Sequence, residues 1–194
     1  LINDLKNPPH RNNEKIDLLS VRSSSSKPIK LSEEVAEQWM RRLLKRAEVT
    51  GSQGEVPVSA IILNGNGQCI GYGNNTRNKN KDPLGHAELI AIKQASLVLG
   101  DWRLNSCTLI VTLEPCPMCA GALIQARMGC IIYGSKDPKR GALGGTLNLA
   151  EHKSAHHKIL IEGGIMAEES RKIIVDWFKE KRVSTRANLL SELR

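Results

Sequence analysis

Two short segments contain residue types that bind metals, and both are expected at the start of a helix. Cys116 and Cys119 lie in Pro-Cys-Pro-Met-Cys, after an apolar run, and His86 and Glu88 lie in His-Ala-Glu, after a polar loop. The positive end of a helix favours thiolates, and two thiols at C-x-x-C spacing can share one metal ion. One imidazole and two thiolates leave a tetrahedral zinc ion with one open position for water. The combination predicts a catalytic rather than a structural zinc site.

Each motif alone has other interpretations. A lone C-x-x-C is often a redox pair or half of a structural zinc site, which needs a fourth ligand. Four other histidines are available, although His10 falls in an expected tail and the spacing of the rest does not demand a role: His10, His152, His156 and His157. Taken together, the two segments match the H-x-E … P-C-x-x-C signature of zinc deaminases. The joint pattern therefore favours deaminase chemistry.

Glu88 decides between the catalytic and the structural interpretation. A carboxylate beside a zinc-bound water can take its proton and pass it to a ring nitrogen and to departing ammonia. Alternatively, Glu88 is an acid that merely suits the positive end of a helix. His86 and Glu88 do not share a face of a regular helix, so both can serve one site only at its first turn.

Composition is consistent with a nucleic-acid partner. The chain has 194 residues, 40% of them apolar, and a formal net charge of +8. This balance fits a polyanionic partner or simply a basic protein, and charge alone does not decide between them. Basic residues gather in 76–81, in 136–140 and in a third cluster: Lys179, Lys181, Arg182 and Arg186. No apolar stretch approaches the roughly 20 residues of a membrane span, so no membrane contact is expected.

The five cysteines argue against a disulfide scaffold, because their number is odd and the chain is not a small cysteine-rich one. Three of them lie in apolar, strand-like runs and are expected to be buried thiols: Cys69, Cys107 and Cys130.

The order of the elements predicts an α/β fold. Residues 1–30 are expected to be a flexible N-terminal arm, 31–183 a zinc deaminase domain and 184–194 a C-terminal tail. Apolar periodicity and turn signals predict helices and strands in this order: helix 32–48, strands 56–63 and 68–72 joined by a hairpin, a loop over 74–85 with no element of its own, helix 86–99, strand 107–113, helix 116–127, strands 130–133 and 158–161, and helix 165–182. Strands that alternate with helices imply parallel pairs and helices on both faces of a five-stranded mixed sheet.

From Trp39 to Lys181 the chain resembles the bacterial-type tRNA adenosine deaminases (TadA). The matching stretches are Val56-Pro57-Val58, Asn75, Asp82-Pro83, His86-Ala87-Glu88, Asp101-Trp102-Arg103-Leu104, Thr112 to Ala122, Tyr133-Gly134 and Asp176-Trp177-Phe178. The resemblance implies a cytidine-deaminase-like three-layer α/β/α sandwich, a homodimer and Zn²⁺ held by His86, Cys116 and Cys119, with Glu88 as proton shuttle. It implies hydrolysis of the wobble adenosine to inosine in an arginine tRNA with anticodon ACG.

The same resemblance assigns further residues to the substrate. Asn75 would hydrogen-bond the flipped purine, and Val58 and Ala87 would line its pocket. Asp137 and neighbouring basic residues would contact the anticodon-loop backbone, and Trp177 and Phe178 would lie near the RNA. Packing in the core is an equally good interpretation of at least one of the two aromatics, and a turn-shaping role is a common one for Asn75.

Some positions depart from the family pattern, so the shape of the 74–85 loop is expected to differ from that of other members: Ser59, Asn74, Leu84 and Gly85. The polar N-terminal segment resembles an organellar form, so a plant chloroplast location is expected, and a targeting segment would precede Leu1. Two other functions stay open. One is deamination of a free base or nucleoside such as guanine or cytidine, and the other is a non-catalytic zinc- and RNA-binding subunit, which would typically lack the carboxylate of Glu88.

Overall fold

The fold is a three-layer sandwich around one mixed sheet. The computed structural model describes residues 27–192, with side chains described for 27–184. The five strands are β1 (Ser59–Leu63), β2 (Cys69–Asn74), β3 (Thr108–Leu113), β4 (Cys130–Ser135) and β5 (Leu160–Gly163). They lie in the order β2-β1-β3-β4-β5, with β1 antiparallel to both neighbours and β3, β4 and β5 parallel. The predicted α/β class and five-stranded mixed sheet are confirmed.

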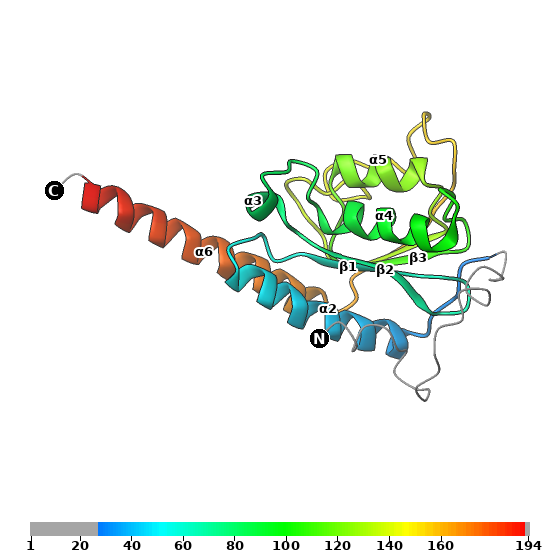
Figure 1. Cartoon of the computed structure of the whole chain (residues 1–194), viewed down its shortest axis with the longest axis horizontal. Helices are drawn as coiled ribbons and strands as arrows, with labels where there is room; N and C mark the ends of the chain where they lie inside the picture. The colour runs from blue at the N-terminus through cyan, green and yellow to red at the C-terminus, as the bar shows by residue number, and fades with distance from the viewer. Residues whose placement is uncertain (1–26, 193–194) are drawn as a thin grey trace.

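Two pairs of helices cover the two faces of the sheet. The first pair is α2 (Glu33–Ser52) and α6 (Ala167–Glu192), and the second is α4 (Ala87–Leu99) and α5 (Pro117–Gln125). Figure 1 shows α2 and α6 on one side of the strands and α4 and α5 on the other. Aliphatic side chains fill both interfaces, so that the sheet separates two apolar clusters. Burial of these side chains is the main force that holds the layers together.

Local signals in the sequence set several of these boundaries. The Ser32 hydroxyl accepts a hydrogen bond from the Val35 amide and caps α2. Gly100 ends α4 in the left-handed conformation, as predicted for a glycine after the last periodic residue. The predicted hairpin after Leu63 is present, with Gly67 at a φ of 78° and Asn64 accepting from the amides of Asn66 and Gln68.

The site lies at the carboxyl ends of β2, β3 and β4. Because β1 is antiparallel to both β2 and β3, β2 runs in the same direction as β3 and β4. The loops that follow β2, β3 and β4 therefore all leave from the same edge. Ligands of open α/β sheets commonly bind at the carboxyl ends of the strands. The two metal-binding segments found in the sequence follow β2 and β3 at this edge.

The approach of α4 to the sheet depends on two glycines of β2. A Cβ atom at Gly71 would lie 2.4 Å from the Ala91 carbonyl oxygen, and one at Gly73 would lie 2.1 Å from that of Ala87. Any side chain at these positions would push the first turns of α4 away from the sheet. Since His86 caps this helix, both glycines help to place it.

Two expectations about the elements are wrong. The 74–85 loop contains a short helix, α3 (Arg77–Asn80), because a buried carboxylate accepts hydrogen bonds from its backbone, as described below. The last helix does not end at Arg182 but continues to Glu192, through the segment expected to be a tail. No Gly or Pro occurs after Arg182 to stop it. Residues 1–26 of the expected arm lie outside the described residues, and where the description begins, the Ile29 carbonyl accepts a hydrogen bond from Thr108 Oγ1 on β3.

None of the described helices is both long and apolar enough to span a membrane. The described cysteines form no disulfides.

Candidate metal centre and active site

The three predicted ligands meet where α4 and α5 begin. His86 is the N-cap residue of α4 and Cys116 is the N-cap residue of α5, with Cys119 in the first turn of α5. The His86 Nδ1 atom lies 3.8 Å from Cys116 Sγ and 3.4 Å from Cys119 Sγ. All three ligand atoms lie within 4.8 Å of one another. The structure thus brings together residues from two segments thirty positions apart in the chain.

This donor set fits a zinc ion. Zinc bound tetrahedrally at about 2.0–2.1 Å from nitrogen and about 2.3 Å from sulfur separates a nitrogen from a sulfur ligand by about 3.6 Å. The two nitrogen–sulfur distances, 3.4 and 3.8 Å, lie on either side of that value. One imidazole and two thiolates are also the ligands that zinc prefers. Among the described residues, the cluster contains no further His, Cys, Asp or Glu.

The protonation of the ligands reflects their proximity. A hydrogen bond from the Cys119 thiol, together with His86, lowers the pKa of Cys116 to about 3 despite burial. The pKa of Cys119 is raised, chiefly because its proton is held by Cys116 and also because it is buried. The pKa of His86 is raised, chiefly by its hydrogen bond with Cys116, although burial and the positive charge of Arg77 act against the rise. The lowered pKa favours Cys116 as the thiolate of the pair.

Glu88 reaches the same cluster from the first turn of α4. Its side chain is 4% exposed and hydrogen-bonds with Cys119. Burial raises the pKa of the Glu88 carboxyl above its usual range, and the negative charge of Cys116 adds to that effect. A carboxyl group whose pKa is raised toward neutrality is suited to both accept and donate a proton. The position next to the ligands is the one that the sequence predicts for a proton shuttle.

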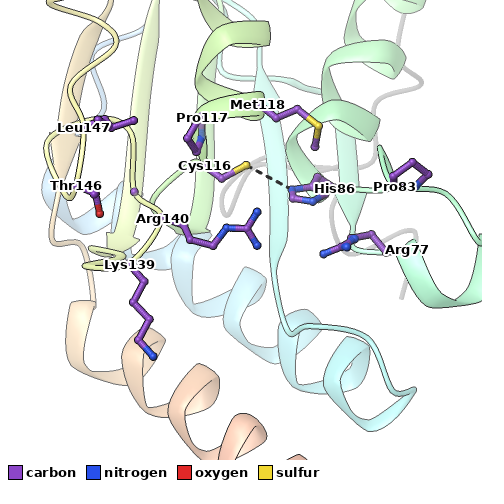
Figure 2. A pocket seen from close by; sticks show the side chains of 11 residues that line it. Arg77, Pro83, His86, Cys116, Pro117, Met118, Lys139, Arg140, Thr146 and Leu147 are labelled. Carbon is purple, nitrogen blue, oxygen red and sulfur yellow. Dashed lines mark hydrogen bonds between the residues drawn. The ribbon is translucent and has the colours of Figure 1, made fainter.

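A cavity of about 410 Å³ opens beside His86 and Cys116. Its walls come from three segments: the 77–83 part of the loop after β2, the first turn of α5, and the 139–147 loop after β4. Three basic side chains line it, those of Arg77, Lys139 and Arg140, and no acidic residue is found among its described lining. In Figure 2, Arg77 and Arg140 extend from opposite sides toward the space beside His86 and Cys116, while Lys139 points away.

A buried carboxylate holds the loop after β4. Glu114 is 2% exposed and accepts hydrogen bonds from the backbone amides of Asp137 (3.0 Å), Leu143 (2.9 Å) and Gly145 (2.8 Å). A Cβ atom at Gly141 would lie 2.3 Å from Glu114 Oε2, and one at Gly145 would lie 2.4 Å from the same oxygen. The loop folds tightly over the carboxylate, and only glycine fits at these two contacts.

A second buried carboxylate holds α3. Glu55 is 4% exposed and accepts hydrogen bonds from the amides of Asn78 (3.2 Å) and Lys79 (2.7 Å). The Asn78 side-chain amide also donates to the Gly54 carbonyl. The Glu55 interaction satisfies backbone donors at the start of a helix, which explains why this short element forms.

Glu55 and Glu114 belong to the site but were not predicted from the sequence. Their partners are backbone amides, which leave no trace in the residue pattern. The available signal was an acid beside an apolar strand: Glu55 precedes β1, and Glu114 follows β3 directly before the Pro-Cys segment. A buried carboxylate needs hydrogen-bond donors, and the backbone amides of the neighbouring loops supply them here.

Three of the predicted substrate residues are joined to the site. The Asn75 side chain accepts a hydrogen bond from the Ala87 amide (3.0 Å) and donates one to the Val56 carbonyl (3.1 Å). The backbone N–H of Asn75 donates to the Val58 carbonyl. Val58, Asn75 and Ala87 are all buried, and none of them is among the described residues that line the cavity. Asn75 thus fixes the start of α4, and its contact with a purine stays a prediction.

The other three predicted substrate residues lie further out. Asp137 belongs to the loop after β4, where its carboxylate accepts from the amides of Lys139 (2.9 Å) and Arg140 (3.1 Å) and shapes the turn that carries them. Trp177 packs against α2 and donates from Nε1 to the Gly51 carbonyl (3.0 Å), while its neighbour Phe178 is 45% exposed. Neither aromatic residue lines the cavity beside His86. Packing therefore explains Trp177, and contact of either ring with RNA stays a prediction.

Comparisons with known proteins agree with this chemistry. The family model for MafB19-like deaminases matches residues 34–182. The tRNA-specific adenosine deaminase of Bacillus subtilis is 36% identical over 151 residues, which are 78% of this chain and 93% of that protein. The tRNA(Ile)-lysidine synthase of Deinococcus radiodurans is 43% identical over 144 residues. The matched part is 74% of this chain but 24% of that synthase, so the chain spans about a quarter of the length of this relative.

Solved structures match the same fold. A structure from work on A-to-I editing by tRNA:A34 deaminases at the wobble position of transfer RNA superposes with a TM-score of 0.67 and 34% identity. The match covers 70% of this chain and 98% of that one. A guanine deaminase from Nitrosomonas europaea superposes with a TM-score of 0.62 at 17% identity, covering 88% and 97%, and this likeness shows the fold alone.

Proposed function

Because this chain belongs to the MafB19-like deaminase family, we propose that it converts an adenosine of transfer RNA to inosine by hydrolysis. The observation that carries the proposal is the meeting of His86, Cys116, Cys119 and Glu88 beside a basic cavity. The similarity to tRNA-specific adenosine deaminases over nearly their whole length supports the choice of substrate.

The proposed reaction exchanges one group on the purine ring. A water oxygen bonds to C6, the bond from C6 to the exocyclic nitrogen breaks, and ammonia leaves, so adenosine and water give inosine and ammonia. The proposed zinc ion, held by His86, Cys116 and Cys119, would lower the pKa of the attacking water when bound. Glu88 transfers the two protons of this water, one to the ring nitrogen N1 and the other to the departing nitrogen. Its burial supports this role, because a raised carboxyl pKa eases the return of the proton.

More specifically, the proposed target is the wobble adenosine of an arginine tRNA with anticodon ACG. Bases of an anticodon loop are already unpaired, so that moving one into a pocket costs little. The cavity of about 410 Å³ beside His86 has room for a purine. A homodimer and a chloroplast location are further parts of the proposal, supported by the resemblance. Light scattering and a fluorescent fusion of the complete gene product would test them.

The experiment offers the zinc-loaded protein an ACG anticodon stem-loop, free adenosine, free guanine and cytidine, and measures products by nucleoside mass spectrometry. Inosine is expected from the stem-loop only, and the Glu88→Ala variant is expected to form none. Turnover of guanine or cytidine without turnover of the stem-loop would instead make this chain a deaminase of small molecules. If the wild-type protein binds zinc and RNA but turns over nothing, the non-catalytic interpretation holds.

A further inference from the structure

The entrance of the cavity has one arginine on each side. Arg77 lies on α3, which follows β2, and Arg140 lies in the loop that follows β4. Figure 2 shows both side chains directed toward the space beside His86 and Cys116. The two cations therefore flank the entrance of the cavity that leads to His86 and Cys116.

Neither Arg77 nor Arg140 forms a salt bridge with another residue whose side chain is described. Four carboxylates of these two segments and their anchors accept hydrogen bonds from backbone amides instead: Glu55 from α3, Asp82 from Leu84, and Asp137 and Glu114 from the loop after β4. Two unpaired cations at one entrance repel each other and are expected to attract an anionic ligand.

Both arginines stand on backbone that is anchored from inside the domain. Two amides of α3 donate to Glu55, and three amides of the loop after β4 donate to Glu114. Hydrogen bonds to a buried carboxylate are stronger than those between neutral groups. The anchors reduce the motion of the two segments, which lowers the entropy lost when a ligand is bound.

We propose that Arg77 and Arg140 form a clamp for RNA phosphates, with each guanidinium binding one of the two phosphates that flank the target adenosine. The inference rests on the proposed function and deepens it, because it makes the nucleic-acid backbone part of the substrate. A guanidinium presents paired N–H donors that match two phosphate oxygens. A base inserted toward His86 would leave its 5′ and 3′ phosphates outside the cavity, at the entrance that the two arginines flank. A free base or nucleoside lacks both phosphates and leaves both cations without a partner.

The kinetic test replaces one phosphate at a time. ACG stem-loops carrying an uncharged methylphosphonate on the 5′ or the 3′ side of the target adenosine are compared with the unmodified RNA. For the wild-type protein we expect kcat/KM to fall about tenfold or more with each modified RNA, since hydrogen bonds to charged groups are worth at least that. On unmodified RNA, Arg77→Ala and Arg140→Ala should each lower kcat/KM by a similar factor. Each variant should then lose its sensitivity to one of the two methylphosphonates.

Lys93→Ala provides the matched control. Lys93 is exposed on α4 and contributes to a different hollow, beside Trp102, so its removal lowers the charge equally without touching the entrance. It should keep wild-type rates and wild-type sensitivity to both methylphosphonates. Unchanged wild-type rates on the modified RNAs, or arginine variants as sensitive to both as the wild type, would overturn the clamp.

A binding measurement separates the clamp from the reaction. Fluorescence anisotropy of a labelled stem-loop, titrated with the zinc-loaded Glu88→Ala protein over a salt series, gives Kd without turnover. Adding either arginine change should raise Kd about tenfold and lower the slope of log Kd against log salt by about one, whereas adding Lys93→Ala should do neither. If the wild-type protein fails to deaminate the unmodified stem-loop, the proposed function fails, and this series still decides the clamp.

Discussion

The Glu114 carboxylate offers the sharpest test of how the active-site loop is held. In Glu114→Gln, the carbonyl oxygen can still accept from Leu143 and Gly145, but the new amide faces the Asp137 N–H. One of three hydrogen bonds to a charged group is lost and two donors meet, a cost of about 2 kcal/mol. For a chain of this length, that loss lowers Tm by about 4–8 °C. Glu114→Ala removes all three bonds and is expected to cost about 5 kcal/mol, a large part of a typical folding free energy.

Thermal unfolding and amide hydrogen exchange measure this effect together. Glu37→Gln is the matched control, because the one described interaction of the Glu37 carboxylate is an exposed ion pair with Arg41, whose loss should cost well under about 1 kcal/mol. In Glu114→Gln the amide of Asp137 should exchange faster, while those of Leu143 and Gly145 keep most of their protection. KM for the stem-loop should rise more than kcat falls, because the loop carries Arg140 and contains no metal ligand. A Glu114→Gln protein with the Tm of the Glu37→Gln control and unchanged exchange at Asp137 would refute the reasoning.

Three further predictions follow from the site and its surroundings. Glu88→Gln should retain zinc, measured by atomic absorption, but lose about 10²-fold or more in kcat, and near-normal turnover would remove Glu88 from the mechanism. In zinc-free protein at pH 7, iodoacetamide should modify Cys116, whose pKa is about 3, but not Cys107, whose pKa burial raises to about 11, and peptide mass mapping reads out the difference. Zinc should protect Cys116, and equal labelling of both thiols would contradict the account. Trp177→Phe removes the hydrogen bond to the Gly51 carbonyl that joins α6 to α2, so chemical denaturation should show a loss of about 1 kcal/mol, whereas an unchanged midpoint would show that the bond contributes little.

The metal ligands and the main elements could be predicted because few residue types satisfy their requirements. Zinc ligands are restricted to a small chemical set, so His86, Cys116 and Cys119 stand out at their spacing. Helix α2 has an apolar stripe and a serine cap, and Gly100 ends α4, so local rules placed both within a few residues. The three-layer arrangement then followed from the alternation of strands and helices.

The two loops at the cavity could not be predicted, because their shape depends on contacts between distant residues. Helix α3 forms where Glu55 accepts from its amides, and Glu55 lies more than twenty positions upstream. Arg77 and Arg140 lie at the same cavity because β2 and β4 run in the same direction and their loops leave the sheet at the same end. The pairing of the strands decides this, and composition does not reveal it. The length of α6 was underestimated because its polar C-terminal part lacks apolar periodicity, yet nothing in that part stops a helix.

Oxygen transfer from isotopic water tests the central claim most directly. The zinc-loaded protein is incubated with an ACG stem-loop in water enriched in ¹⁸O, and the digested nucleosides are analysed by mass spectrometry. We expect inosine at the first anticodon position with ¹⁸O on C6, one ammonia per inosine, and no product from the Glu88→Ala protein. Unchanged adenosine, or inosine that carries only ordinary oxygen, would contradict it.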